Sequence, residues 1–408
     1  MKLCNFAALC LAATVLASPA HAGGLYLQEF MTPNMGTAAA GAQARADSAA
    51  TAFENPAGMT RLERSEIMVG AGLGVTDVRF DPDGDTPVPG GNSGQAGGPV
   101  PVLSLSYVQK ITEDLSAGLG LISVSGAALD YNDDWVGRFQ NQEVDLLTLS
   151  AIPSLAYRIT DWLSVGAGAH ILYATLDIKA ALPTPGPGDG RVKVEDADDV
   201  DVGFVGGVLL EPLEGTRLGV TYQSKVEPKL SGKVKIEPVG VQAGIDLEFP
   251  LVETVRVGVY QDITAQWAVL GSLRWENWSQ FDHQPITTDR GSAVARTGWR
   301  DTYGFNLGVH YRPAEKWLLQ VGFAYDSSPV SDGNRNAALP VDRQLRYAGG
   351  VQYDLTERVN IGAALEFVDL GDAKIDNARQ LIGDYEDDHA VFFGLNFGYK
   401  FGLQRQEQ

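Results

Sequence analysis

Few residues of this chain could serve as catalytic nucleophiles or bases, and none is in a recognisable local motif. Beyond residue 22, the histidines are His170, His283, His310 and His389. None of them lies in a short motif with a serine and an acid, although a hydrolytic triad can also assemble in space. The only cysteines, Cys4 and Cys10, are close to the N-terminus.

Four cations could instead recognise a ligand that carries a carboxylate. They are Arg138, Lys179, Arg296 and Arg300. A carboxylate in an apolar pocket needs a guanidinium or an ammonium group beside it. For each of the four taken singly, a solvated loop residue or an ion pair with one of the 51 acids of the chain is the favoured interpretation.

Two acidic segments, Asp81 to Asp85 and Glu195 to Asp201, could attract a divalent cation. The first is too short for an EF-hand loop, which ends in a distal glutamate. A cation could bridge these segments to phosphates of surface sugars, but a solvated acidic loop is the favoured interpretation. No metal site and no cofactor are predicted.

The first 22 residues have the pattern of a signal peptide. Lys2 gives a positive start, Phe6 to Leu16 is a short apolar run, and Ala20-His21-Ala22 is a cleavage site. Cleavage would remove both cysteines, so disulfides and thiol chemistry are excluded from the exported protein.

The charge balance excludes one class of partner. The 408 residues include 31 Lys and Arg against 51 Asp and Glu, for a net charge of −20. A nucleic-acid partner is therefore not expected, since binding phosphates requires a basic face. No apolar run is long enough for a membrane-spanning helix, but alternating strands of a membrane barrel would give the same average hydropathy.

From about residue 66 onward, the chain alternates apolar and small or polar residues. In Asp301 to Tyr311, for example, Tyr303, Phe305, Leu307, Val309 and Tyr311 fall on one face. Side chains alternate along a strand with period 2, so each such segment predicts a strand with one oily face. We count fourteen of them between residues 66 and 401.

The connections between these strands alternate in length. Short ones fall near 110–113, 159–161, 212–215, 261–264, 312–316 and 354–357, and long ones at 81–99, 129–143, 181–198, 228–251, 277–299, 327–340 and 369–388. All short turns would then lie at one end and all long loops at the other. This predicts an all-β fold, a 14-stranded antiparallel transmembrane β-barrel in the outer membrane, with the short turns in the periplasm.

Aromatic residues flank the short turns, as in Tyr157 to Trp162 and Tyr260 to Trp267, and would form an interfacial girdle. The last strand carries Gly394, Phe397, Tyr399 and Phe401, spaced like a signal for the barrel-assembly machinery. Residues 402–408 extend beyond it.

Residues 23–65 do not alternate and are rich in alanine and glycine. They could hang free in the periplasm or fill the lumen as a plug. A barrel of fourteen strands has a lumen wide enough to need a plug unless it is an open pore, so the plug is favoured.

Several segments resemble the FadL family of long-chain fatty acid transporters. Gly23 to Phe30 and Asn55-Pro56-Ala57-Gly58 resemble the N-terminal hatch of that family. Tyr131-x-x-x-Trp135-x-Gly137-Arg138-Phe139 resembles the segment after its third strand. Trp275-x-x-Trp278-Ser279-x-Phe281, and Ala324 to Val330 followed by Leu339-Pro340-x-x-Asp342-Arg343, resemble its second half.

The resemblance implies a fourteen-stranded barrel with a hatch in its lumen and passive transport of hydrophobic ligands. Outer loops would capture the ligand, a lumenal pocket would bind it, and a kink in the third strand would release it sideways into the bilayer. Ser125-Gly126 lies where that kink falls. The alternative is that the glycines of this strand, including Gly118 and Gly120, only ease packing against the plug.

Leu25 and Phe30, in the hatch start, join the four cations as candidate ligand contacts. Arg256, Arg274, Arg346, Glu366 and Lys400 face inward by parity and are expected to pair with each other or with the hatch. Long-chain fatty acid is the default cargo, with aromatic hydrocarbons or alkanes as the alternative. An outer-membrane lipase or protease, or an adhesin, is less favoured. The expected surroundings are outer-membrane lipids and lipopolysaccharide, around a monomer.

Overall fold

The computed structural model describes residues 31–184, 188–289, 291–377, 381–385 and 387–402. The candidates Leu25 and Phe30 therefore lie outside the described residues, as does the signal peptide. Among the described residues, no helix is long and apolar enough to cross a membrane.

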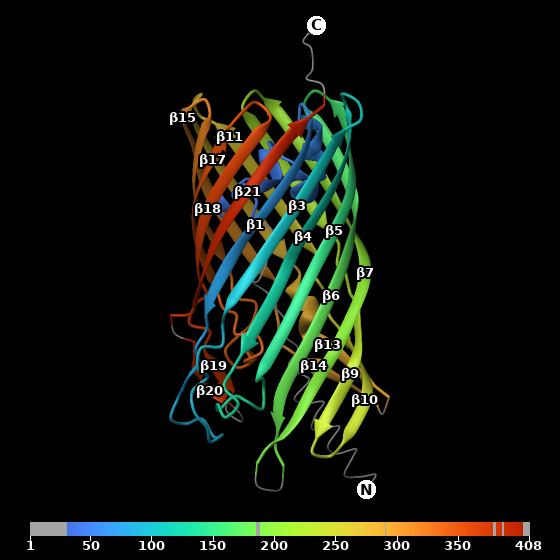
Figure 1. The fold of residues 1–408 in the computed structure, drawn as a ribbon, viewed down its shortest axis with the longest axis vertical. Helices are drawn as coiled ribbons and strands as arrows, with labels where there is room; N and C mark the ends of the chain where they lie inside the picture. The colour runs from blue at the N-terminus through green and yellow to red at the C-terminus, as the bar shows by residue number, and fades with distance from the viewer. Residues whose placement is uncertain (1–30, 185–187, 290, 378–380, 386, 403–408) are drawn as a thin grey trace.

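Within the described part of the chain, fourteen strands form one closed antiparallel barrel (Figure 1). They are β1 (Ser65–Asp77), β3 (Pro99–Lys110), β4 (Leu115–Asp130), β5 (Glu143–Thr160), β6 (Leu163–Leu182), β7 (Gly190–Leu213), β8 (Thr216–Gln223), β11 (Thr254–Asp262), β12 (Trp267–Glu276), β15 (Thr302–Ala314), β16 (Trp317–Asp326), β17 (Gln344–Asp354), β18 (Val359–Asp369) and β21 (His389–Phe401). The first strand, β1, pairs with both β3 and β21, which closes the ring. The predicted architecture is confirmed.

The alternation of β15 shows why these residues form a membrane wall. Tyr303 and Leu307 point outward and are 63% and 59% exposed, whereas Asn306 and His310 point inward and are buried. In the bilayer the outward residues meet lipid, and closure leaves no strand edge without a hydrogen-bonding partner.

The short connections all lie at the top of the barrel in Figure 1 and the longer ones at the bottom. The short ones span 111–114, 161–162, 214–215, 263–266, 315–316 and 355–358. Aromatic pairs flank several of them, including Trp267 with Tyr311 at 4.2 Å and Trp317 with Tyr353 at 4.5 Å between ring centroids. These amphipathic rings suit the boundary between lipid and water.

This asymmetry predicts which residues face the cell exterior. Glu315→Cys places a thiol in a short turn and Asp372→Cys places one in a long loop, both at exposed positions. The sequence has cysteines only at positions 4 and 10, within the expected signal peptide. A polymer-linked maleimide too large to enter the periplasm should label intact cells only at position 372. Labelling at 315 without membrane permeabilisation would invert the topology.

The long loop expected at 181–198 is partly strand. The strand β6 continues to Leu182, and β7 already begins at Gly190. The prediction of a solvated loop at Glu195 to Asp201 is therefore wrong, because this segment lies on β7. The inner side chains Val192 and Val194 are buried, while charged residues alternate with them. The prediction missed this strand because it required an oily outward face, which a strand outside the bilayer does not need.

Further elements extend the wall beyond the membrane. The strand β7 pairs with β9 (Lys229–Glu237), followed by β10 (Val241–Glu248), β13 (His283–Thr288) and β14 (Gly291–Arg296). The short helix η3 (Trp278–Asp282) precedes β13. A small sheet of β2 (Asp81–Pro82), β19 (Ile375–Asn377) and β20 (Leu381–Asp384) lies among the loops, so the acidic segment at Asp81 joins a sheet.

Four short helical elements precede the first strand and lie inside the barrel near the short-turn end (Figure 1). They are η1 (Met35–Thr37), α2 (Ala42–Arg45), α3 (Thr51–Glu54) and η2 (Pro56–Arg61). Nearly all of their side chains are buried. We call residues 31–64 the inner segment.

Candidate functional site

The inner segment packs against glycines on the inner face of the wall. A Cβ at Gly219 on β8 would collide with the carbonyl of Gln43, and one at Gly322 on β16 would collide with the backbone of Thr37. Gly118 and Gly120 on β4 approach Met59 and Phe53 in the same way. Small residues on the inward face therefore let the segment lie directly on the strands.

Asn55 fixes the corner between α3 and η2. Its Nδ2 donates to the carbonyls of Gln43, at 2.7 Å, and Val208, at 3.0 Å, and its Oδ1 accepts from the backbone N–H of Ala57. Pro56 begins η2, where its missing N–H costs no helical hydrogen bond. The Asn-Pro-Ala sequence thus anchors the inner segment to β7.

The wall is interrupted between β3 and β4. Their pairing runs from Lys110↔Ser116 only as far as Ser104↔Ile122, although both strands continue. Residues 99–103 of β3 pair with β1 alone. The pairing of β4 with β5 shifts register between Ser123 and Gly126, where Ser125-Gly126 was expected to kink the strand.

Gly126 differs from its neighbours on β4. Among the described atoms, a Cβ there would come within 4 Å only of the carbonyl oxygen of Leu146, at 3.3 Å, and of no residue of the inner segment. Packing against the segment therefore explains Gly118 and Gly120 but not Gly126.

An apolar pocket, which we call the wall pocket, lies beside Gly126. It holds roughly 640 Å³ of space empty of protein atoms, part of it open to solvent. The residues around it are mostly aliphatic or aromatic: Thr76, Val78, Val100, Gly126, Ala128, Leu129, Leu339, Pro340, Val341, Gln344, Leu370 and Phe392. Such a pocket suits a hydrophobic ligand.

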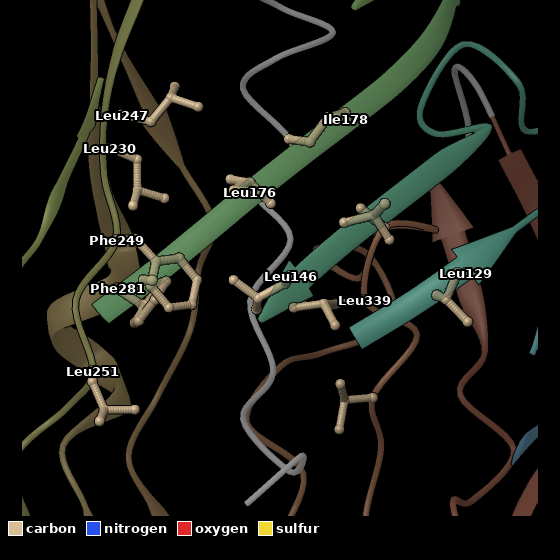
Figure 2. Close-up of a cluster of buried hydrophobic side chains, with 14 of the residues drawn as sticks. Leu129, Leu146, Leu176, Ile178, Leu230, Leu247, Phe249, Leu251, Phe281 and Leu339 are labelled. Atoms are coloured by element: carbon tan, nitrogen blue, oxygen red, sulfur yellow. The ribbon is translucent and has the colours of Figure 1, made fainter. Parts of the chain in front are cut away.

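A second group of apolar side chains lines the lumen towards the long loops. Figure 2 shows Leu146 on β5 and Leu176 and Ile178 on β6 across from side chains of the outer elements, which include Leu230, Leu247, Phe249 and Phe281. We call this group the lumen cluster. Leu129 and Leu339 belong to it and also line the wall pocket, so the two apolar regions are continuous.

Aromatic residues hold the outer loops together above this region. The ring of Tyr131 stacks on Trp135 at 4.4 Å, and the Tyr131 hydroxyl lies 2.9 Å from that of Tyr385. Phe80 contacts both Trp135 and Tyr385. Three loops that are far apart in the sequence therefore meet at one buried cluster.

The structure does not bring the four predicted cations together. Arg138 pairs with Asp189 at 2.7 Å, and Lys179 with Asp133 at 3.1 Å. Arg296, on β14, and Arg300 are exposed. None of the four lines the wall pocket.

The inward-facing charges form a chain of ion pairs around the lumen, which we call the charged belt. Arg256 lies 3.9 Å from Glu54 of α3. Arg274 pairs with Glu276 and Asp326, and Arg346 with Asp326 at 3.0 Å and Glu366 at 4.0 Å. Lys400 is the cross-strand partner of Glu66. The expectation that these inward charges pair with each other or with the hatch holds for Arg346 with Glu366 and for Arg256 with Glu54 of the inner segment. Arg274 pairs with Glu276 and Asp326 instead.

Glu54 shows how strongly its surroundings disfavour charge. Burial raises the pKa of this carboxyl to about 7, although Arg256 and the Asn34 side chain act in the opposite direction. A buried carboxylate needs a close, well-oriented partner to stay ionised.

One polar arrangement was not foreseen. The Ser150 Oγ lies 2.6 Å from His170 Nε2, and the Gln223 side chain is 3.2 Å from His170 Nδ1. These residues come from β5, β6 and β8, so no sequence motif could have signalled them. The amide of Gln223 occupies the position that a carboxylate has in a hydrolytic triad, and all three side chains are buried.

A closed barrel with an oily outer face and an interior filled by its own N-terminal segment defines a plugged outer-membrane protein. A family model described as "Outer membrane protein transport protein (OMPP1/FadL/TodX)" matches residues 13–401. The chain therefore belongs to this family of outer-membrane transport proteins.

Individual relatives agree over nearly the whole chain. A long-chain fatty acid transport protein of Escherichia coli O6:H1 is 27% identical, over 97% of this chain and 98% of its own length. Outer membrane protein P1 of Haemophilus influenzae is 25% identical, over 98% and 100%. The crystal structure of a FadL homologue from Pseudomonas aeruginosa has a TM-score of 0.82 at 20% identity, over 91% of this chain and 100% of its own. The Pseudomonas putida toluene transporter TodX has a TM-score of 0.72 at 16% identity, over 92% and 97%.

Proposed function

We propose that the protein takes up hydrophobic compounds passively, with long-chain fatty acid as the default cargo. The observation that carries this proposal is the interrupted pairing of β3 with β4, backed by an apolar pocket continuous with the lumen cluster. The outer loops would capture cargo, the lumen cluster would bind it, and the gap at Ser125-Gly126 would release it.

Lateral release into lipid is energetically reasonable. Each CH₂ moved out of water gains about 0.8 kcal/mol, so a long acyl chain leaves an apolar pocket far more readily for lipid than for the periplasm. The sugar-rich outer leaflet is the barrier that the protein bypasses.

The inner segment would act as the hatch that denies polar solutes a path. Residues 1–22 would be cleaved, 23–65 would form the hatch, 66–401 the barrel, and 402–408 an extension. Leu25 and Phe30, near the hatch start, remain proposed ligand contacts, as do Arg138, Lys179, Arg296 and Arg300. Lipopolysaccharide, the barrel-assembly machinery and a monomeric state complete the proposal.

Aromatic hydrocarbons or alkanes are the second candidate cargo. Among the described residues, the lining of the wall pocket includes no cation, which favours these uncharged compounds. Catalysis is not part of the proposal, because His170 faces the amide of Gln223 where a hydrolytic pair would have an acid.

Uptake of labelled oleate and labelled toluene by cells that produce the protein, compared with cells that do not, tests the function. Protein-dependent uptake of oleate is expected, and uptake of toluene alone would select the second cargo. If production of the protein changed the uptake of neither compound, transport of hydrophobic cargo would be ruled out.

A further inference from the structure

Among the described residues, three cations near the wall pocket each pair with an acid. Arg79 pairs with Asp77 at 3.0 Å, Arg335 with Asp332 at 2.9 Å, and Arg343 with Asp369 at 2.7 Å. A charged cargo group that entered the pocket would have to displace one of these acids.

The charged belt adjoins the wall pocket. Glu366 is the cross-strand partner of Phe392, and Asp326 is that of Gln344, and both partners line the pocket. Among the described residues of the belt, the four carboxyl groups of Glu54, Glu276, Asp326 and Glu366 face the three guanidinium groups of Arg256, Arg274 and Arg346. Each of the three guanidinium groups therefore already has an acidic partner within the belt.

The carboxyl group of Asp388 shows how the surroundings of the pocket affect the ionisation of a carboxyl group. The Asp388 carboxylate accepts a hydrogen bond from the backbone N–H of Arg79, which follows the pocket residue Val78. The Asp388 carbonyl accepts one from the backbone N–H of Leu370, which lines the pocket itself. Burial, reinforced by Asp77 and Asp81, raises the pKa of this carboxyl to about 8. A carboxyl group at the rim of the pocket therefore favours its neutral form.

We infer that the route from the lumen cluster to the wall pocket carries uncharged molecules only. Hydrocarbons, esters and alcohols pass as they are, and a fatty acid passes after its carboxylate has taken up a proton from water. This inference rests on the proposed transport function and names the class of cargo within it. Burial without a counter-charge disfavours the ionised form of a carboxylate in the same way.

Three labelled probes that share a twelve-carbon chain test the inference: methyl laurate, lauric acid and dodecanesulfonate, all well below micellar concentrations. Protein-dependent cell uptake is measured at several pH values. Uptake of the ester should not change with pH. Uptake of the acid should fall by about tenfold per pH unit once its carboxyl ionises, and the permanently charged sulfonate should not enter.

Glu366→Gln tests the role of the charged belt, with Glu315→Gln in an exposed short turn as its control. The first variant leaves three acids facing three arginines and should give measurable uptake of the sulfonate, while uptake of the ester stays unchanged. The control should behave as the unmodified protein.

The outcomes separate the two proposals. Failure of all three probes to enter would refute the transport function itself. Sulfonate uptake by the unmodified protein at a rate similar to that of the ester would overturn the inference while leaving transport intact. The comparison of probes in the unmodified protein decides this even if Glu366→Gln fails to assemble.

Discussion

Replacing Gly126 by tryptophan is expected to lower cargo uptake on the order of tenfold while leaving capture at the cell surface intact. A tryptophan side chain can bury roughly 150–250 Å² of surface, enough to obstruct a narrow exit. Gly126 lies at the register shift and lines the wall pocket, and of the described atoms only the Leu146 carbonyl oxygen, at 3.3 Å, would lie within 4 Å of a Cβ there. The ring would therefore extend into the wall pocket at the proposed exit. Uptake and surface binding of the same labelled cargo measure the two steps separately.

Gly206→Trp is the matched control for this variant. Gly206 is on β7, and a side chain there would also meet open space, but it does not line the pocket. Both proteins should assemble, because an aromatic ring suits the apolar wall. Normal uptake by a well-assembled Gly126→Trp protein would refute lateral release and favour passage down the lumen.

The second large effect is expected from deleting residues 23–51. The barrel strands pair with one another without this segment, so the barrel should still assemble. Entry of small sugars should rise on the order of tenfold, because larger barrels without a plug leave an aqueous channel. Sugar influx into cells or proteoliposomes measures the change.

Deleting Asp83 to Asp85, three exposed loop residues, removes chain without opening the lumen and should leave sugar entry unchanged. If the hatch deletion also left sugar entry unchanged, the inner segment would not be a plug.

The sequence predicts the barrel well because every membrane strand must alternate with period 2. The predicted limits of β16 and β21 match the structure, and those of most other membrane strands differ by only a few residues. The strands β9 and β10 were read as loop, because beyond the bilayer their outward faces carry charges such as Lys233 and Lys235. Whether a segment with such a charged face is a strand depends on whether it lies inside or beyond the bilayer, which the sequence does not show.

The site was less predictable from the sequence. Parity places Arg256 and Arg346 inside the barrel but cannot show that Glu54 and Asp326 are their partners, because those contacts depend on where the hatch sits and how neighbouring strands are staggered. The point where β3 and β4 separate depends on the register of their pairing, which residue types alone do not fix. Only the resemblance to a known family pointed to Ser125-Gly126 in advance.

The position of Met31 has a consequence for how the protein is made. Its backbone carbonyl accepts from Ser104 of β3, and side chains at Gly70 and Gly72 of β1 and at Gly394 of β21 would collide with it. Pairing of β1 with β21 joins residues as distant in the sequence as Ser65 and Phe401, and contacts of such long range form slowly. Because glycines at these positions leave room for Met31, the seam between the first and last strands can close with or without the inner segment, which then covers the seam from the lumen.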